Sequence, residues 1–417
     1  MELLDARWHQ AMLVVLAGAH LASGDMLGDL LEDALTPLEV APELYVADHE
    51  QMQLRPVRNA GGPLWIDGTL AGRVFQLGTV LEGRDDEGRR VLWVPLVDGA
   101  ERLGVARMVV IANPDDEDSS STDPTLAEHC LAIAGLVAHL MASKFTQGDE
   151  LAVARRARPM SVAGELLWQL LPPLTVGGQG LAMAAVLEPA YDVSGDAFDY
   201  AISTSRADFA IFDSSGHDLN AGLTTSVTLA ASRSARREGH DIAGVAARID
   251  ATLTEQFSDH RFVTGVLAQL DLQSGRLRYL IAGHPPPVLL RGGKAVRTLD
   301  AVLRMPFGRL ASLIPQSDEL GEEYLEPGDR ILLHSDGVVE ARDENGEEFG
   351  VDRLVELAEH AAAAQVAAPE TLRRLAHAVR EHRKGELRDD ATLMLVEWSG
   401  SAAERLLARP VEDGKDH

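Results

Sequence analysis

Apolar residues form two kinds of pattern in the N-terminal part of this chain. Through residues 12–31 they recur at helical spacing, which predicts a helix or a helix pair that Pro37 and Pro42 end. The apolar runs that follow are shorter and are separated by glycines and other turn residues, so they predict an antiparallel sheet. These runs lie at residues 64–66, 73–77, 91–97 and 104–111.

A helical region is predicted next. The acidic, serine-rich tract at residues 115–121 predicts a solvated loop. After it, apolar residues are spaced alternately by four and three positions, which is the pattern of a coiled-coil seam. The seam residues are Leu126, Cys130, Ile133, Val137 and Leu140. A second helix is predicted over residues 150–171, where Pro172 and Pro173 end it.

The C-terminal half alternates strand-like runs with helical blocks. Hairpin signals such as Ser274-Gly275 join consecutive strands. Strands are predicted at 181–187, 209–212, 262–270, 276–281, 287–291, 330–333 and 392–398, and helices at 221–238, 242–257, 351–364 and 369–383. Together these elements predict an α+β fold in which helices flank an antiparallel β-sandwich.

The length of 417 residues exceeds a single compact core and predicts two or three domains. We expect an α/β sensor-like domain at 1–120 and a helical linker at 121–175. A sandwich domain at 176–400 and a polar tail at 401–417 would complete the chain.

Composition narrows the class of protein. Hydrophobic residues make up 46% of the chain, which indicates a globular protein. The formal net charge of −27 argues against a nucleic-acid backbone or an anionic membrane as a partner. The single cysteine, Cys130, rules out an internal disulfide and indicates a reducing compartment. Neither a secretory signal nor an apolar run of about 18–20 residues is recognised, which predicts a cytoplasmic location without membrane insertion.

Candidate chemistry comes from four aspartates, each placed where an apolar run meets a turn. They are Asp196, Asp213, Asp336 and Asp389. Strand ends are where functional loops begin. Carboxylates without a cysteine or histidine cluster beside them suit hard divalent cations. If the four converge in space, they predict a metal-dependent hydrolase.

The motifs around these aspartates follow one another in a recognisable order. They are Asp-Val-Ser-Gly-Asp at 192–196, Asp-Ser-Ser-Gly-His at 213–217, Phe-Val-Thr at 262–264, Ala-Gly-His-Pro-Pro-Pro at 282–287, Leu-Glu-Pro-Gly-Asp at 325–329, Ser-Asp-Gly-Val-Val-Glu-Ala at 335–341 and Asp-Asp-Ala-Thr at 389–392. Each motif alone is weak. In this order they resemble the SpoIIE-like branch of the metal-dependent protein phosphatases, also called protein phosphatase 2C.

The resemblance implies a protein-serine/threonine phosphatase that uses two Mn²⁺ or Mg²⁺ ions. Asp213 would bridge the ions and, with Asp336, be central to catalysis. The implied ligand set is Asp196, Asp213, the Ser214 carbonyl, Asp336 and Asp389. Such ions, about 3.5–4 Å apart, activate a water for attack on a phosphate monoester. The resemblance further implies a phosphorylated anti-anti-sigma-type protein as substrate, in bacterial partner-switching signalling.

Two departures from the family pattern leave a rival reading open. Ser194 and Asp218 stand where the family usually has glycine. Asp218 could recruit a further metal or repel substrate, although its position favours capping the helix that follows. The rival is a catalytically weak phosphatase-fold module that binds a partner. Each predicted ligand also has a simpler reading as a turn aspartate.

Neighbouring residues receive structural predictions. His217 and His284 could act as general acids, but a structural hydrogen bond and a rigid Gly-His-Pro turn are favoured for them. Asp390, next to Asp389, would support the ligands or begin a strand. Cys130 lies on the helical seam without the arginine of a cysteine phosphatase and is predicted to be packing.

The N-terminal region resembles a GAF-type sensor domain. The resemblance rests on the run at 93–97, the Asp98-Gly99 turn and the strand that opens at 103–105. A PAS-like domain is the competitor, and a dimerisation or spacer domain without a ligand is the simpler alternative. The predicted seam suggests a parallel homodimer whose helices carry the sensor's state to the catalytic domain.

Overall fold

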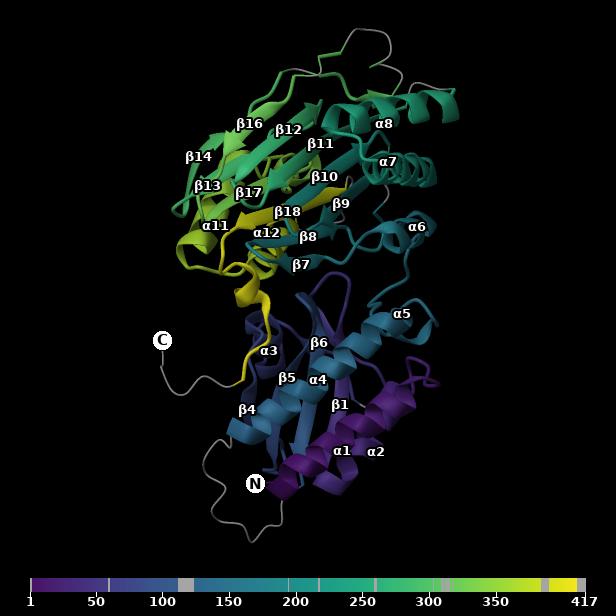
Figure 1. The fold of residues 1–417 in the computed structure, drawn as a ribbon, viewed down its shortest axis with the longest axis vertical. Coiled ribbons are helices and arrows are strands. Elements are labelled where there is room, and N and C mark those ends of the chain that lie inside the picture. The colour runs from purple at the N-terminus through teal and green to yellow at the C-terminus, as the bar shows by residue number, and fades with distance from the viewer. Residues whose placement is uncertain are drawn as a thin grey trace. The chain divides into compact units, whose positions relative to one another are not determined.

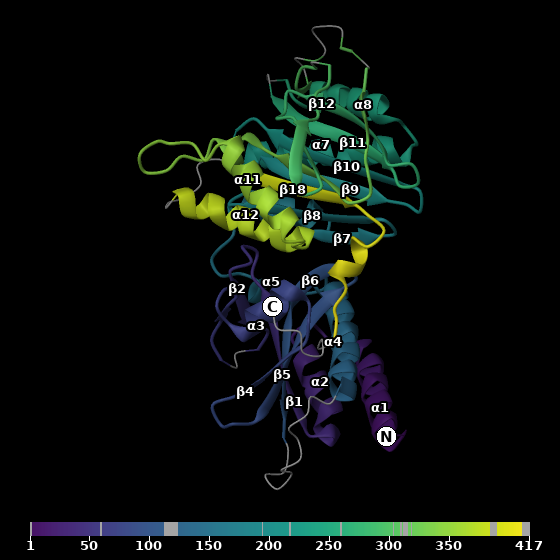
Figure 2. The same cartoon turned by 90° about the vertical axis from the view of Figure 1, so that its left-hand side faces the viewer.

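The computed structural model describes residues 2–58, 61–111, 124–193, 195–216, 218–258, 261–302, 304–308, 311, 316–317, 319–383 and 390–410. The chain forms two compact units, which are shown in Figures 1 and 2. The N-terminal unit comprises Met1–Arg158 with Leu406–His417, and the C-terminal unit comprises Pro159–Arg405. Each is a mixture of helices and antiparallel strands, so the predicted α+β class is confirmed.

The N-terminal unit is built on one antiparallel sheet with the strand order β3-β2-β1-β6-β5-β4. Its strands are β1 (Val40–Ala47), β2 (Gln53–Pro56), β3 (Leu64–Trp65), β4 (Leu81–Arg84), β5 (Arg90–Asp98) and β6 (Glu101–Val110). Its helices are α1 (Glu2–Ala19), α2 (Leu27–Leu35), η1 (Thr36–Leu38), α3 (Leu70–Leu77), α4 (Pro124–Lys144) and α5 (Glu150–Ala154). Helices α1, α2 and α4 share one apolar core with the sheet, and α3 packs in a second core that contains Tyr45 and Val105. The predicted helix pair at the start is confirmed.

The run at 73–77, for which the sequence predicts a strand, lies in helix α3. Thr69 caps this helix by accepting a hydrogen bond from the Gly72 amide at 3.0 Å. The helix ends at Gly78, whose φ of 66° is the left-handed conformation that glycine adopts easily. Ala71, Val74 and Phe75 form its buried face. A short apolar run fits either element, and here the cap and the terminal glycine select the helix.

Helix α4 corrects the coiled-coil prediction. Its seam residues Cys130 and Ile133 are fully buried in the core of the N-terminal unit, where the helix packs on β5 and β6. The four-three spacing fits any helix with one apolar face, and this face is covered by the unit's own sheet. The segment Thr125–Lys144 is also long and apolar enough to cross a membrane, with a mean hydropathy of 1.5. A core helix passes the same test of length and composition, and α4 packs its apolar face into the core of its own unit.

The predicted linker at 121–175 is not a separate region. Its first part, α4 and α5, belongs to the N-terminal unit, and the units divide at Arg158 and Pro159. The helix predicted over 150–171 is two helices, α5 and α6 (Val162–Leu170). Helix α5 ends at Ala154, and Pro159 then disfavours helical backbone at Arg158, within the break. Ser161 then caps α6 by accepting from the Gly164 amide at 3.0 Å.

The C-terminal unit is a four-layer sandwich of helices, sheet, sheet and helices. The first sheet has the order β16-β12-β11-β10-β9, with β15 paired to β11, and the second has the order β14-β13-β17-β18-β8-β7. The first sheet contains β9 (Asp196–Ile202), β10 (Arg206–Ser214), β11 (Phe262–Asp271), β12 (Arg276–Ala282), β15 (Phe307–Gly308) and β16 (Gly321–Tyr324). The second contains β7 (Thr175–Gly178), β8 (Leu181–Glu188), β13 (Val288–Arg291), β14 (Lys294–Thr298), β17 (Asp329–His334) and β18 (Ala391–Trp398).

Helix pairs cover the two outer faces of this sandwich, as Figure 1 shows. Helices α7 (Leu219–Arg237) and α8 (Ile242–Gln256) pack on the first sheet, and α11 (Val351–Ala363) and α12 (Ala368–Arg383) pack on the second. Successive side chains of strand β10 point alternately to the two cores on either side of the first sheet. Phe209 and Ile211 enter the core between the sheets, whereas Ala210 and Phe212 enter the core under α7 and α8. The predicted sandwich under outer helices is confirmed.

Strand β9 is the important element that the sequence pattern does not reveal. Its sequence includes Asp199, which is buried and interrupts the apolar run. Arg233 and Arg236 of α7 pair with this carboxylate at 2.7 and 2.9 Å. A buried charge is tolerated when it is paired in this way, so the strand forms in spite of its polar residue.

The end of the chain also differs from the predicted polar tail at 401–417. After η2 (Ala403–Leu406), the segment returns to the N-terminal unit. The Arg409 amide donates to the Gly78 carbonyl at 2.8 Å, and the Val80 amide donates to the Arg409 carbonyl at 3.0 Å. Residues 411–417 lie outside the described part of the chain.

Candidate metal centre

Strands β9 and β10 bring the first two predicted ligands together. Asp196 opens β9 and lies directly opposite Asp213 near the end of β10 in the antiparallel register. Opposed residues in such a ladder have Cβ atoms about 4.5–5.5 Å apart. On its other side, Asp213 is paired with Thr264 of β11. Asp196 is 1% exposed and Asp213 is half-buried, so the pair lies at the edge of the buried interior.

Gly195 allows the two aspartate motifs to approach each other closely. A Cβ atom at this position would lie 2.8 Å from the carbonyl oxygen of Ser214 and 3.2 Å from that of Gly216. The Ser214 amide donates to the Gly195 carbonyl at 3.1 Å, and the Thr225 hydroxyl donates to the same carbonyl at 2.5 Å. The Ser214 carbonyl, a predicted ligand, therefore lies beside the first motif.

The second sheet contributes Ser335 and the start of a short helix, α10 (Asp336–Val339). The fully buried Ser335 hydroxyl donates to Asp196 Oδ2 at 2.7 Å and accepts from the Thr392 amide at 2.9 Å. Asp336 follows as the first residue of α10. A Cβ atom on Gly337 would lie 1.9 Å from the Asp390 carbonyl oxygen, so only glycine permits this approach. The third predicted ligand is thus held where the two sheets meet.

Asp390 supports the first motif from the second sheet. Its Oδ2 accepts from the Gly195 amide at 2.6 Å and from the Asp196 amide at 3.3 Å. This matches the supporting role predicted for Asp390. The predicted ligand Asp389, together with Ser194 and His217, lies outside the described residues.

The electrostatics of this cluster favour a cation. Burial raises the pKa of Asp196 well above its usual value, and the charges of Asp213 and Asp390 raise it further. The hydrogen bond from Ser335 acts in the opposite direction. Buried carboxylates that repel one another are stabilised when a cation joins them. An all-oxygen, anionic donor set fits Mg²⁺ or Mn²⁺. Among the residues that the structure describes, no group of three or more His, Cys, Asp or Glu side chains is placed to hold a metal ion.

His284 lies next to this centre but has a structural environment. Its Nδ1 is 2.9 Å from the Thr264 hydroxyl, and the ring is buried. Burial, assisted by the nearby His334, lowers the pKa of His284 to about 3. The imidazole is therefore neutral at neutral pH and holds no imidazolium proton for a leaving group. This agrees with the turn role favoured from sequence.

Asp218 is a helix cap, as favoured from sequence. Its Oδ1 accepts from the Asn220 amide at 2.8 Å and from the Ala221 amide at 3.2 Å, at the start of α7. These contacts satisfy amides that a helix start leaves unpaired. The departure from the family's glycine thus has a local structural reason.

The sequence analysis did not predict the hydroxyl groups of Ser335 and Thr225 as parts of this centre. Ser335 immediately precedes a predicted ligand, and this position in the Ser-Asp-Gly motif is a signal that could have identified it. Thr225 lies in the middle of α7, and only the packing of that helix on the ends of β9 and β10 brings it to Gly195. No local pattern marks such a residue.

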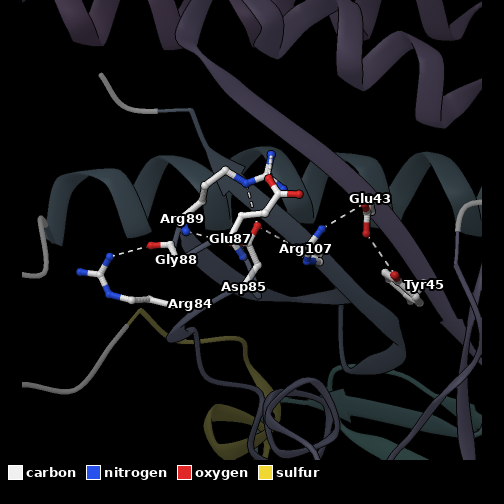
Figure 3. Close-up of polar contacts among 8 residues, drawn as sticks. All are labelled: Glu43, Tyr45, Arg84, Asp85, Glu87, Gly88, Arg89 and Arg107. Atoms are coloured by element: carbon white, nitrogen blue, oxygen red, sulfur yellow. Dashed lines mark hydrogen bonds and ion pairs between the residues drawn. The ribbon is translucent and has the colours of Figure 1, made fainter. Parts of the chain in front are cut away.

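Carboxylates in the N-terminal unit are arranged differently, as Figure 3 shows. Arg107 lies between Glu43 and Asp85, at 3.0 and 3.4 Å, and Arg89 contacts Asp85 at 2.8 Å. The Tyr45 hydroxyl donates to Glu43 at 3.1 Å. Although burial opposes it, hydrogen bonding from Arg89 holds the pKa of Asp85 below its usual value. These carboxylates are neutralised by arginines and need no metal ion.

Comparison with known proteins places the C-terminal unit in a family. Residues 203–399 match the family model described as Stage II sporulation protein E (SpoIIE). The chain is 25% identical over 241 residues to phosphoserine phosphatase RsbU of Bacillus subtilis (strain 168), covering 57% of this chain and 69% of that protein. It is 28% identical over 154 residues to phosphoserine phosphatase RsbP of the same organism, covering 36% of this chain and 37% of that protein.

A solved structure, the SiaA-PP2C domain of Pseudomonas aeruginosa, is 21% identical with a TM-score of 0.49 and covers 62% of this chain and 99% of that one. The family assignment rests on the sequence matches. The family match and the relatives named phosphoserine phosphatases indicate that the C-terminal unit is a protein-serine/threonine phosphatase domain of the protein phosphatase 2C type. The C-terminal unit belongs to the SpoIIE family of such phosphatases.

Proposed function

We propose that this chain is a metal-dependent protein-serine/threonine phosphatase that hydrolyses phosphoserine or phosphothreonine on a signalling protein. The observation that carries the proposal is the cross-strand pair of the buried Asp196 and the half-buried Asp213, with Asp390 beside it. Such a cluster is unfavourable by itself and becomes favourable around a divalent cation.

Each residue has a proposed role in this centre. Following the family resemblance, Asp213, the Ser214 carbonyl, Asp336 and Asp389 would hold one ion, and Asp196 with Asp213 would hold the second. Ser335 orients Asp196 through its 2.7 Å hydrogen bond, and Asp390 holds the first motif through the Gly195 amide. Bound Mn²⁺ or Mg²⁺ supplies charge neutralisation for the phosphate and lowers the pKa of a water.

The substrate we propose is a phosphorylated regulator of the anti-anti-sigma type. The family resemblance supports it, as do relatives named phosphoserine phosphatases. We place the reaction in the cytoplasm, in keeping with the lone Cys130, whose pKa burial raises to about 12. The N-terminal unit would act as a GAF-like sensor. A homodimer would use a surface other than the α4 seam, since that seam is buried in its own unit.

The rival function is a catalytically weak phosphatase-fold binding module. It drew support from the departures at Ser194 and Asp218. Asp218 caps α7, a structural role that weakens the support which this residue gives to the rival. The departure at Ser194 still supports it.

The deciding experiment measures hydrolysis of a phosphoserine protein and of a generic phosphate ester by the purified chain with Mn²⁺. Asp213→Asn and chelation are each expected to reduce the rate by more than about 100-fold, since even outer partners of a metal site are worth about 10–100-fold. Glu43→Gln is the matched control, because it removes a carboxylate that arginine already neutralises. Metal binding by the unmodified chain without turnover of either substrate would favour the binding module.

A further inference from the structure

A cleft of about 540 Å³ lies within the C-terminal unit, away from the carboxylates. Small-molecule sites commonly have volumes of about 300–1,000 Å³. The cleft is lined by Arg330 at the start of β17 and Glu397 near the end of β18. The metal centre lies at the other end of these strands, beside Ser335 and Asp390. At about 3.3 Å per residue, the two sites are about 20 Å apart.

The cleft is also lined by a sequence motif that lies outside the metal centre. Residues 326–329 of the Leu-Glu-Pro-Gly-Asp motif form one wall, and Gly292 and Gly293 of the β13–β14 turn form another. A Cβ atom on Gly292 or Gly328 would meet no atom within 4 Å, so the space beside these glycines is open. Helix α11 contributes its C-terminal end through Ala362 and Ala363.

One side of the cleft carries more positive than negative charge. Arg330 Nη2 lies 3.1 Å from Glu397 Oε2, and Arg405 pairs with the same carboxylate. One carboxylate cannot neutralise two guanidinium groups. The Arg330 side chain is 7% exposed. Within the described part of the chain, Arg330 Nη1 and Arg405 Nε are buried and have no hydrogen-bond partner. Burial lowers the pKa of Arg330, and the charge of Arg405 adds to this effect.

The opposite side is already neutralised or accepts hydrogen bonds. Arg291 pairs with Asp329 at 2.6 Å and with Glu326 at 2.8 Å. The C-terminal end of α11 adds the negative end of the helix dipole, although the carbonyl of Ala362 already accepts from the Gln365 amide at 3.0 Å. This side favours hydrogen-bond donors, and the exposed Glu326 disfavours a ligand of high negative charge.

We propose that this cleft binds a small molecule with a single anionic group, a carboxylate or a phosphate, at the Arg330–Arg405 side. Hydrogen-bond donors at the ligand's other end meet the C-terminus of α11. Zwitterions of amino-acid size have this distribution of charge. The site is independent of the proposed phosphatase activity, because it shares no residue with the metal centre.

Calorimetric titration of the full chain at constant ionic strength tests the proposal. Inorganic phosphate and glycine serve as probes, in EDTA to exclude binding through metal ions. We expect saturable binding of one of the two probes at one site. Binding of inorganic phosphate would indicate a phosphate ligand, and binding of glycine would indicate a carboxylate ligand. Arg405→Ala should weaken this binding by at least about 10-fold, the effect expected for removal of a charged partner. Asp213→Asn should leave it unchanged.

Arg342→Ala is the matched control, because Arg342 is an exposed arginine that pairs with Glu348 elsewhere in the unit. If Arg405→Ala fails to fold, Ser399→Leu replaces it by filling the cleft from a residue that lines it. Absence of saturable binding by both probes overturns the proposal. Binding that Arg405→Ala or Ser399→Leu leaves unchanged also overturns it.

Discussion

The two units hold carboxylates on antiparallel sheets in opposite electrostatic situations. In the N-terminal unit, Glu43 and Asp85 meet Arg107 and Arg89, and the pKa of Asp85 is lowered (Figure 3). In the C-terminal unit, burial and neighbouring carboxylates raise the pKa of Asp196. The contrast teaches that the partners of a carboxylate, and not its position at a strand end, separate a stabilising group from a candidate ligand.

The geometry around Asp196, whose pKa is raised, explains how the fold tolerates this buried carboxylate. Asp196 receives a hydrogen bond from Ser335, and Asp390 binds the adjacent backbone amides. Close backbone approach at Gly195 and Gly337 sets these positions. The like charges are thus imposed by the backbone of two sheets, whereas in the N-terminal unit each charge attracts its neighbour.

The largest expected effect comes from Gly337→Ala. Its Cβ would lie 1.9 Å from the Asp390 carbonyl, so the start of α10 must move and carry Asp336 with it. We expect a stability loss of about 1–3 kcal/mol from overpacking and a large loss of phosphatase rate. Denaturant unfolding and the phosphoserine assay measure the two effects. Gly400→Ala is the control, because its Cβ meets nothing within 4 Å; equal rates for both variants would contradict the account.

A second expected effect is the pH dependence of the C-terminal unit. The pKa of His284 is lowered to about 3 in the folded state and is about 6.5 when unfolded, so the unfolded chain binds a proton first on acidification. The contribution of His284 to stability is therefore present above about pH 6.5 and falls below it, by up to about 1.4 kcal/mol per pH unit. The unfolding free energy of His284→Asn should fall less steeply as the pH is lowered. If the unfolding free energy of the unmodified chain and of His284→Asn changed with pH in the same way, protonation of His284 would not explain the pH dependence.

A direct test of the comparison uses one variant in each unit without metal. Asp196→Asn keeps an acceptor for Ser335 and removes a repelled charge, so in EDTA we expect a gain in unfolding free energy. Asp85→Asn should lower the unfolding midpoint slightly, since it removes an attracted charge. The same sign of change for both variants in denaturant unfolding would show that the distinction is not electrostatic.

The smallest effect is expected at Asp218. Asp218→Ala removes an N-cap and should cost about 1 kcal/mol of stability, whereas Asp218→Asn keeps an acceptor for the Ala221 amide and costs little. Neither change should alter phosphatase rate, because the carboxylate is engaged with the helix. A rate altered by Asp218→Asn at unchanged stability would mean that this residue acts on substrate or metal.

Much of the C-terminal unit follows from local sequence. Alternation along β10 and β11 and the helical spacing of α7 and α8 place the elements within a few residues. The aspartate motifs identify strand ends because each follows an apolar run. Strand β9 escapes prediction because Asp199 is satisfied by arginines of α7 that are distant in sequence.

The features that the sequence did not predict correctly all depend on contacts between segments that are distant in sequence. The seam of α4 has the spacing of a coiled coil, and only the presence of a sheet to cover it decides its role. Ser335 and Thr225 reach Asp196 and Gly195 through tertiary packing. The pairing of Arg409 with Gly78 and Val80 likewise joins distant segments that no local pattern connects.

The most direct test of the central claim is Mn²⁺ binding measured by calorimetry on three proteins: the unmodified chain, Asp213→Asn and Glu43→Gln. The account predicts binding by the unmodified chain and by Glu43→Gln with the same affinity. Asp213→Asn should bind at least about 10–100-fold more weakly. Equal Mn²⁺ affinity for Asp213→Asn and the unmodified chain would contradict the assignment of the metal centre to the Asp196–Asp213 pair.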